Sequence, residues 1–124
     1  MKDCRVLIVD DVPDVRLLLR ASIGRKFPRL QIDEAESGRE ASMRLEGSVY
    51  RFVISDQEMP DGTGSWLYQF MCEHCPAIPL VIFTSCPERF CGNIGGTLRA
   101  IIPKTDLGGV ISELEKVCCC GAET

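Results

Sequence analysis

The stretch Arg5-Val6-Leu7-Ile8-Val9-Asp10-Asp11 places a short, mostly apolar run directly before a pair of acids. A run of this length with a polar end is typical of a strand buried inside a parallel sheet. Three further runs end in the same way: Phe52-Val53-Ile54-Ser55 before Asp56, Leu80-Val81-Ile82-Phe83 before Thr84, and Ile101-Ile102-Pro103 before Lys104. If these runs are neighbouring strands, one edge of the sheet gathers three carboxylates, a hydroxyl and an ammonium group.

Longer amphipathic segments separate the apolar runs, a pattern that predicts repeated βα units around a parallel sheet. We expect five helices and five strands. The strands are predicted near residues 4–9, 30–35, 51–55, 79–84 and 99–102.

Capping residues and apolar spacing predict where the helices begin. Asp11 is expected to cap the first helix, with Pro13 in its first turn. The inward stripe of that helix is predicted to consist of four apolar residues: Val15, Leu18, Leu19 and Ile23.

The later helices follow the same logic. Ser37 and Glu40 form a capping box for the second helix, which Gly47 ends. The third helix is predicted over residues 64–73, and Asp106 is expected to cap the fifth. A fourth helix is expected to be short or mobile, because three glycines, each unfavourable in a helix by up to ~1 kcal/mol, crowd its second half. These are Gly92, Gly95 and Gly96.

Size and charge narrow the class of protein. The 124 residues predict a single domain covering 1–124. The net charge of -4 and the lack of a basic cluster argue against direct nucleic-acid binding, and no separate DNA-binding domain is expected to follow. The apolar runs are far shorter than the ~20 residues of a membrane span, and the N-terminus does not resemble a signal peptide. We therefore expect a cytoplasmic protein with no membrane association.

Eight cysteines are many for this length. Without a secretion signal they are expected to be reduced thiols. Cys72-Glu73-His74-Cys75 resembles half of a zinc site, but the remaining cysteines form no matching second pair. We expect no structural zinc.

The polar groups at the strand ends suggest a cation and phosphoryl site. In parallel α/β sheets, ligands bind outside the carboxyl ends of the strands. Three carboxylates that lie close together repel one another, so either the pKa of one of them is raised or the group binds a cation. Mg²⁺ is a cation that prefers oxygen ligands. Beside such a cation, Asp56 can act as a nucleophile toward a phosphoryl group, with Lys104 and Thr84 contacting the phosphoryl oxygens. Taken singly, each acid is readily explained as a helix cap or turn residue, and a loop lysine and a strand-end residue are the favoured explanations for Lys104 and Thr84. These explanations do not easily account for all five positions together.

Four features together resemble the receiver domain of two-component response regulators over nearly the whole chain. They are Asp10-Asp11, the string Asp56-Gln57-Glu58-Met59-Pro60-Asp61-Gly62-Thr63-Gly64, Thr84-Ser85, and Lys104. The resemblance implies a flavodoxin-like (βα)5 three-layer α/β sandwich whose five parallel strands are ordered 2-1-3-4-5. It further implies a signalling switch that catalyses only its own phosphorylation and dephosphorylation, and not a turnover enzyme.

By the same resemblance, Asp56 is the phosphoacceptor. Asp11 and Asp56 bind Mg²⁺ directly together with the main-chain carbonyl of Glu58, and Asp10 helps through water. Thr84 and Lys104 contact the phosphoryl group. The donor is a histidine kinase or a histidine phosphotransfer protein. The fourth helix, fifth strand and fifth helix form the output face toward an unknown domain or partner, and the same face is a candidate for pairing with a second copy of the chain.

The chain departs from the family pattern at three places. Ile101 stands where receivers commonly carry a mobile aromatic residue. Pro103 precedes Lys104 and Thr105 follows it, whereas the family lysine is usually followed by a proline in a cis peptide. Glu58 occupies a variable position near the phosphoryl group, where its charge could affect the lifetime of the phosphorylated state.

Two other function classes stay open at this point. A Mg²⁺-dependent phosphatase or phosphotransferase of the haloacid dehalogenase type also uses a strand-end aspartate, and Glu58 loosely matches its second acid. The paired acids after the first strand and the lack of a cap insertion favour the receiver. A receiver-like interaction module that acts without phosphorylation is the other alternative, permitted by Ile101 and Thr105.

Overall fold

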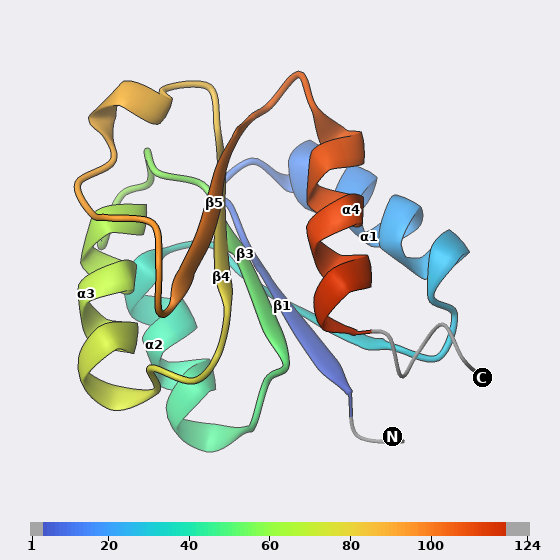
Figure 1. The fold of residues 1–124 in the computed structure, drawn as a ribbon, viewed down its shortest axis with the longest axis horizontal. Coiled ribbons are helices and arrows are strands. Elements are labelled where there is room, and N and C mark those ends of the chain that lie inside the picture. The colour runs from blue at the N-terminus through green and yellow to red at the C-terminus, as the bar shows by residue number, and fades with distance from the viewer. Residues whose placement is uncertain (1–3, 119–124) are drawn as a thin grey trace.

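The structure is a computed structural model that describes residues 4–118 (Figure 1). Its five parallel strands are ordered β2-β1-β3-β4-β5, as predicted. They are β1 (Arg5–Val9), β2 (Gln31–Ala35), β3 (Phe52–Ser55), β4 (Leu80–Thr84) and β5 (Leu98–Pro103). The helices of the described residues are α1 (Pro13–Lys26), α2 (Gly38–Gly47), α3 (Gly64–His74), α4 (Leu107–Val117) and a single 3-10 turn, η1 (Pro87–Arg89).

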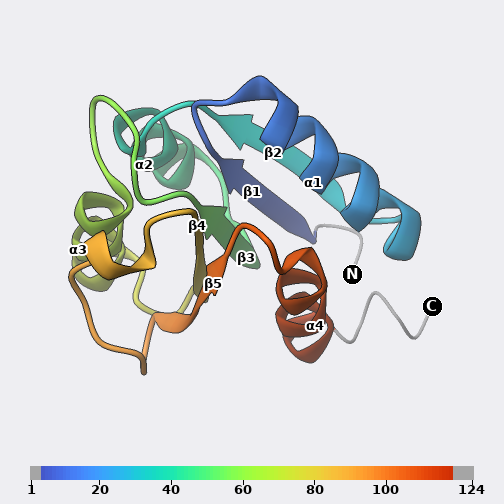
Figure 2. The ribbon, with the colours of Figure 1, turned by 90° about the horizontal axis from the view of Figure 1, so that it is seen from above.

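The helices cover both faces of the sheet and form three layers, with α1 and α4 on one face and α2 and α3 on the other (Figures 1 and 2). Alternating strand residues supply the two cores because successive side chains point to opposite faces. Val6 and Ile8 pack toward α1 and α4, while Leu7 and Val9 pack toward α2 and α3. This double burial explains why the strands read as continuous apolar runs.

The predicted fourth helix is wrong. Residues 85–97, here called the β4–β5 connection, contain only η1 and an isolated bridge between Gly95 and Leu98. Gly95 and Gly96 have φ values of +128° and +58°, outside the helical range. The helix that follows β5, expected as the fifth, is α4.

Two details of the predicted first helix are also wrong. The N-cap of α1 is Val12, without a side-chain cap, because the Asp11 carboxylate lies among other acids instead. Leu18 is 51% exposed, whereas Leu19 and Ile23 are buried, because the inward stripe follows a spacing of four residues. The predicted caps Ser37 and Asp106 are confirmed, since their side chains accept hydrogen bonds from Glu40 N and Gly109 N.

Among the described residues, no helix is both long enough and apolar enough to cross a membrane.

Candidate functional site

The predicted acids meet at the carboxyl ends of β1 and β3. These strands are hydrogen-bonded neighbours with Val9 opposite Ser55, so the residues that follow each strand emerge side by side. Asp10, Asp11 and Asp56, here called the acidic cluster, each offer a carboxylate oxygen, and these oxygens lie within 4.8 Å of one another. Asp10 and Asp56 are buried, whereas Asp11 is exposed.

Lys104 brings a positive charge to this cluster from the end of β5. Its Nζ lies 2.8 Å from Asp10 Oδ2 and 3.4 Å from Asp56 Oδ2. Its main-chain N–H donates to Thr84 O at 3.1 Å, which ties the end of β5 to the end of β4. The structure thus joins residues that are 94 and 48 positions apart in the chain.

Burial and the contact between the two side chains together shift the pKa values of Asp10 and Lys104. Burial raises the pKa of Asp10, and the hydrogen bonds from Lys104 and from Val12 N–H oppose this only in part. Burial alone would lower the pKa of Lys104, but its hydrogen bond to Asp10 and the charges of Asp10 and Asp56 raise it overall. Lys104 therefore remains an ammonium group at neutral pH.

The donor set of the acidic cluster fits a hard cation. All three groups are carboxylates, and one lysine compensates only part of their charge. Oxygen-rich sites that are open on one side suit Mg²⁺, which keeps several waters and binds through few protein ligands. The exposed Asp11 supplies that open side. A role for the Glu58 main-chain oxygen remains a prediction.

Thr84 lies at the predicted strand end, but its hydroxyl is hydrogen-bonded within the turn that follows the strand. The residue is fully buried, and its Oγ1 accepts a hydrogen bond from Cys86 N at 3.2 Å. Contact between this hydroxyl and a phosphoryl group remains a prediction.

The loop that follows Asp56 is held against the start of α2. Gly38 N and Arg39 N donate to Gly62 O and Asp61 O at 2.9 and 3.0 Å. Asp61 and Gly62 adopt positive φ angles of 54° and 106°. A Cβ on Gly62 would lie 2.9 Å from Arg39 N, so the close approach requires glycine. These contacts fix the position of the loop beside the acidic cluster.

Gln57 is a site residue that sequence reasoning missed. Its main-chain N–H donates to Asp56 Oδ1 at 2.7 Å. Its buried side chain accepts from Ser65 N at 2.8 Å and Ser65 Oγ at 3.0 Å, and it donates to Arg89 O at 3.2 Å. Ser65 Oγ also accepts from Cys91 N at 2.8 Å. Gln57 thus joins the Asp56 loop to the β4–β5 connection.

All three departures from the family pattern have defined surroundings. Ile101 is half-buried and packs against the core beneath α2 and α3. The described peptide bonds, Lys104–Thr105 included, are all trans. The exposed Glu58 side chain pairs with Arg89 at 3.5 Å.

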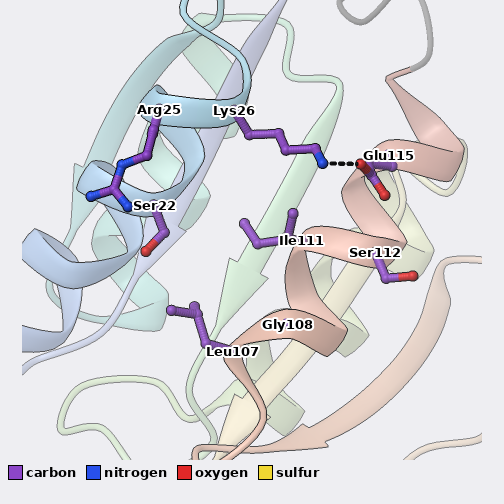
Figure 3. Close-up of a pocket in the computed structure, with 8 residues that line it drawn as sticks. All are labelled: Ser22, Arg25, Lys26, Leu107, Gly108, Ile111, Ser112 and Glu115. Atoms are coloured by element: carbon purple, nitrogen blue, oxygen red, sulfur yellow. Dashed lines mark ion pairs between the residues drawn. The ribbon is translucent and has the colours of Figure 1, made fainter.

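A groove between α1 and α4 is separate from the acidic cluster (Figure 3). Leu107 and Ile111 line it, and the ion pair between Lys26 and Glu115, at 2.8 Å, closes one end.

The described part of the chain offers one grouping of three or more potential metal-ligating side chains, the acidic cluster. Cys72 and Cys75 of the half-site motif are free thiols.

A family model described as "Response regulator receiver domain" matches residues 6–91. Response regulator protein PilR of Pseudomonas aeruginosa is 33% identical over 81 residues, which are 65% of this chain and 18% of PilR. The gliding motility regulatory protein of Myxococcus xanthus is 31% identical over 114 residues, 86% of this chain and 14% of that protein. This chain thus spans less than a quarter of the length of either relative.

Solved structures share the fold. Response regulator protein TrrA of Thermotoga maritima, in complex with Mg²⁺-BeF, has a TM-score of 0.80 at 23% identity, covering 92% of this chain and 98% of that one. The RcsB response regulator of Salmonella typhimurium has a TM-score of 0.71 at 22% identity, covering 94% of this chain and 61% of that one.

Proposed function

Because the chain belongs to the response regulator receiver domain family, we propose that it is a phosphorylation-dependent signalling switch with Asp56 as its phosphoacceptor. The observation that carries this proposal is the meeting of three carboxylates within 4.8 Å with an ammonium group that contacts two of them. A carboxylate nucleophile, oxygen ligands for a cation and a fixed positive charge are the parts that phosphoryl transfer to aspartate requires.

The proposed reaction forms an acyl phosphate on Asp56. A carboxylate oxygen attacks phosphorus, the bond between phosphorus and the donor's histidine nitrogen breaks, and the electron pair leaves with the imidazole. Lys104 would neutralise charge on the phosphoryl oxygens, a role that its contacts with Asp10 and Asp56 support. Asp10, Asp11, Asp56 and the main-chain oxygen of Glu58 would hold Mg²⁺, which when bound supplies further charge stabilisation. Thr84 would contact the phosphoryl group after a rotation away from Cys86 N.

The partner that supplies the phosphoryl group is proposed to be a histidine kinase or a histidine phosphotransfer protein in the cytoplasm. Residues 1–124 act as one receiver domain that catalyses only its own phosphorylation and dephosphorylation. The matched relatives are several times longer than this chain, which supports an output carried by another domain or by a separate protein.

The proposed output face consists of the β4–β5 connection, β5 and α4, and the same face is a candidate for pairing with a second copy. The hydrogen bonds of Gln57 support this assignment, because they link the loop after Asp56 directly to the connection. A change in charge at Asp56 alters the acceptor of the Gln57 N–H bond. A resulting shift of Gln57 would alter the hydrogen bonds of its side chain with Arg89 and Ser65.

Phosphorylation by acetyl phosphate tests the assignment of Asp56. Wild type should gain one phosphoryl group by intact mass in the presence of Mg²⁺ and none in the presence of a chelator. Asp56→Asn should abolish the gain. Asp61→Asn is the matched control, because Asp61 lies in the same loop, is exposed, and has a left-handed conformation that asparagine tolerates. Undiminished labelling of Asp56→Asn would refute the proposal.

Two further assays separate the alternative function classes. Continuous phosphate release from a phosphomonoester would instead indicate a phosphatase of the haloacid dehalogenase type. A module that works without phosphorylation should show no thermal shift with Mg²⁺ and beryllofluoride, whereas the proposed switch should be stabilised by them.

A further inference from the structure

We propose that Arg16 is a positioning residue that orients Asp11 for cation binding. The inference rests on the proposed function, because it concerns the Mg²⁺ site of the same acidic cluster. Arg16 lies on the second turn of α1, and its side chain is only 13% exposed.

Arg16 holds the peptide group that joins the first two acids. Its Nη1 donates to Asp10 O at 2.6 Å, and its Nε donates to Glu34 Oε1 at 2.8 Å. Glu34 belongs to β2, so the guanidinium is anchored on the sheet while it reaches the loop between β1 and α1. A planar guanidinium with two such bonds has little rotational freedom.

Three neighbouring polar groups of Asp10 and Val12 already have partners within the fold. Asp10 N donates to Ala35 O at 3.0 Å, and Val12 N donates to Asp10 Oδ1 at 2.9 Å. Asp10 Oδ2 is paired with Lys104. The bond from Arg16 holds the Asp10 carbonyl, and it thereby orients the Asp10–Asp11 peptide plane from which the exposed Asp11 carboxylate leaves the chain.

The direction in which Mg²⁺ affinity changes on loss of Arg16 distinguishes a positioning role from a purely electrostatic one. A positive charge beside a cation site repels the cation, so loss of Arg16 would tighten Mg²⁺ binding if charge alone mattered. If Arg16 orients Asp11, its loss weakens binding. Contacts that orient ligands in this way change metal affinity by about 10- to 100-fold when removed.

Arg20 provides a matched control one helical turn later. Its Nε donates to the same glutamate, Glu34 Oε2, at 2.7 Å. Its Nη2 donates to Ile32 O at 2.9 Å instead of to the loop. Arg20 therefore shares the charge and the anchor of Arg16 but has no bond to Asp10 O.

Mg²⁺ titration by isothermal calorimetry tests the inference. Arg16→Met should weaken binding about tenfold, Arg16→Lys should also weaken it despite keeping the charge, and Arg20→Met should change it by less than about twofold. The rate of phosphorylation by acetyl phosphate should fall at low Mg²⁺ and recover at saturating Mg²⁺. Glu34→Gln, which weakens the anchor but keeps its shape, should give an intermediate loss of affinity even if Arg16→Met does not fold.

Unchanged or tighter Mg²⁺ binding by folded Arg16→Met would overturn the inference and leave the proposed function standing. Equal losses in Arg16→Met and Arg20→Met would also overturn it, since Arg20 has no bond to Asp10 O and the shared contact with Glu34 would then explain both. Absence of Mg²⁺ binding by wild type would instead contradict the proposed function, and the positioning role with it.

Discussion

The loop between β1 and α1 and the β4–β5 connection leave the same edge of the sheet but are held in different ways. In the first, Asp10 alone pairs with Lys104, Val12 and Arg16. In the second, residues 85–96 are exposed or half-buried except for Phe90, and the side chains of Gln57 and of Ser65 in α3 supply two of its polar contacts. The comparison indicates that the acidic cluster is held rigidly, whereas the β4–β5 connection is held weakly. Elements that move have few buried contacts, so the connection is the part expected to respond to a change at the site.

The largest expected effect on stability comes from truncating Phe90, the one buried side chain in residues 85–96. Phe90 packs edge-to-face on Tyr68, with ring centroids 5.5 Å apart, within the core beneath α2 and α3. Phe90→Ala should lower the free energy of unfolding by about 3 kcal/mol, measured by urea denaturation. Ile94→Ala, at a 65% exposed position in the same segment, should change it by less than about 0.5 kcal/mol. Similar losses in both variants would contradict this account of the connection.

A glycine-to-alanine substitution should change the stability with opposite signs in the β4–β5 connection and in α1. Gly96→Ala should destabilise the protein by about 1 kcal/mol or more, because Gly96 has a φ of +58°. Gly24→Ala should stabilise it by about 0.5–1 kcal/mol, because Gly24 lies inside α1 and a Cβ there meets no atom within 4 Å. Thermal unfolding of both variants measures the contrast, and equal signs would contradict it.

Acid should weaken the ion pairs that Glu34 makes with Arg16 and Arg20 of α1, and so lower the stability of the fold. The hydrogen bond from Arg20, together with that from Arg16, lowers the pKa of Glu34 below its ordinary value of 4.5, although burial opposes this. A lowered pKa stabilises the folded state above about pH 4.5 and loses that contribution as pH falls through the folded-state value. Because Glu34 is partly exposed, the contribution should be below about 1 kcal/mol. Glu34→Gln should lack this acid-dependent part in unfolding measured from pH 7 to pH 3, and an unchanged pH profile would argue against it.

The smallest expected effect is local opening of the connection. Ser65→Ala removes the acceptor of the Cys91 N–H, so the Cys91 amide should lose protection in hydrogen exchange while the Val12 amide keeps it. The global loss of stability should be about 1 kcal/mol or less. Thr63→Ala is the control, since Thr63 caps α3 through Trp66 N. Equal loss of Cys91 protection in both variants would mean that α3 as a whole, and not Ser65, holds the connection.

The sequence predicts an element correctly where its local pattern matches the way that element is buried in the fold. The five strands were found because continuous apolar runs fit strands covered on both faces. Ser37 and Asp106 were recognised as caps because capping depends on residues three apart in the chain. The predicted fourth helix is wrong because Gly95 and Gly96 adopt conformations that no right-handed helix allows.

Other failures came from contacts across the fold. Asp11 has the residue type of a helix cap, but its carboxylate lies beside Asp10 and Asp56, so the cap is left to Val12. Gln57 gave no local signal, since its partner carbonyl at Arg89 is 32 positions away. Arg16 likewise depends on Glu34, 18 positions away, for its anchor.

The sequence alone determined the alternation of strands and helices and the polar residue that ends each central strand. Both are properties of short segments, because apolar periodicity and strand-end chemistry are local. Only the tertiary structure decided that Lys104 pairs with Asp10, that Gln57 binds the β4–β5 connection, and that Arg16 holds the Asp10 carbonyl. Those contacts depend on strand order and on buried polar groups finding partners across the sheet, which no local pattern specifies.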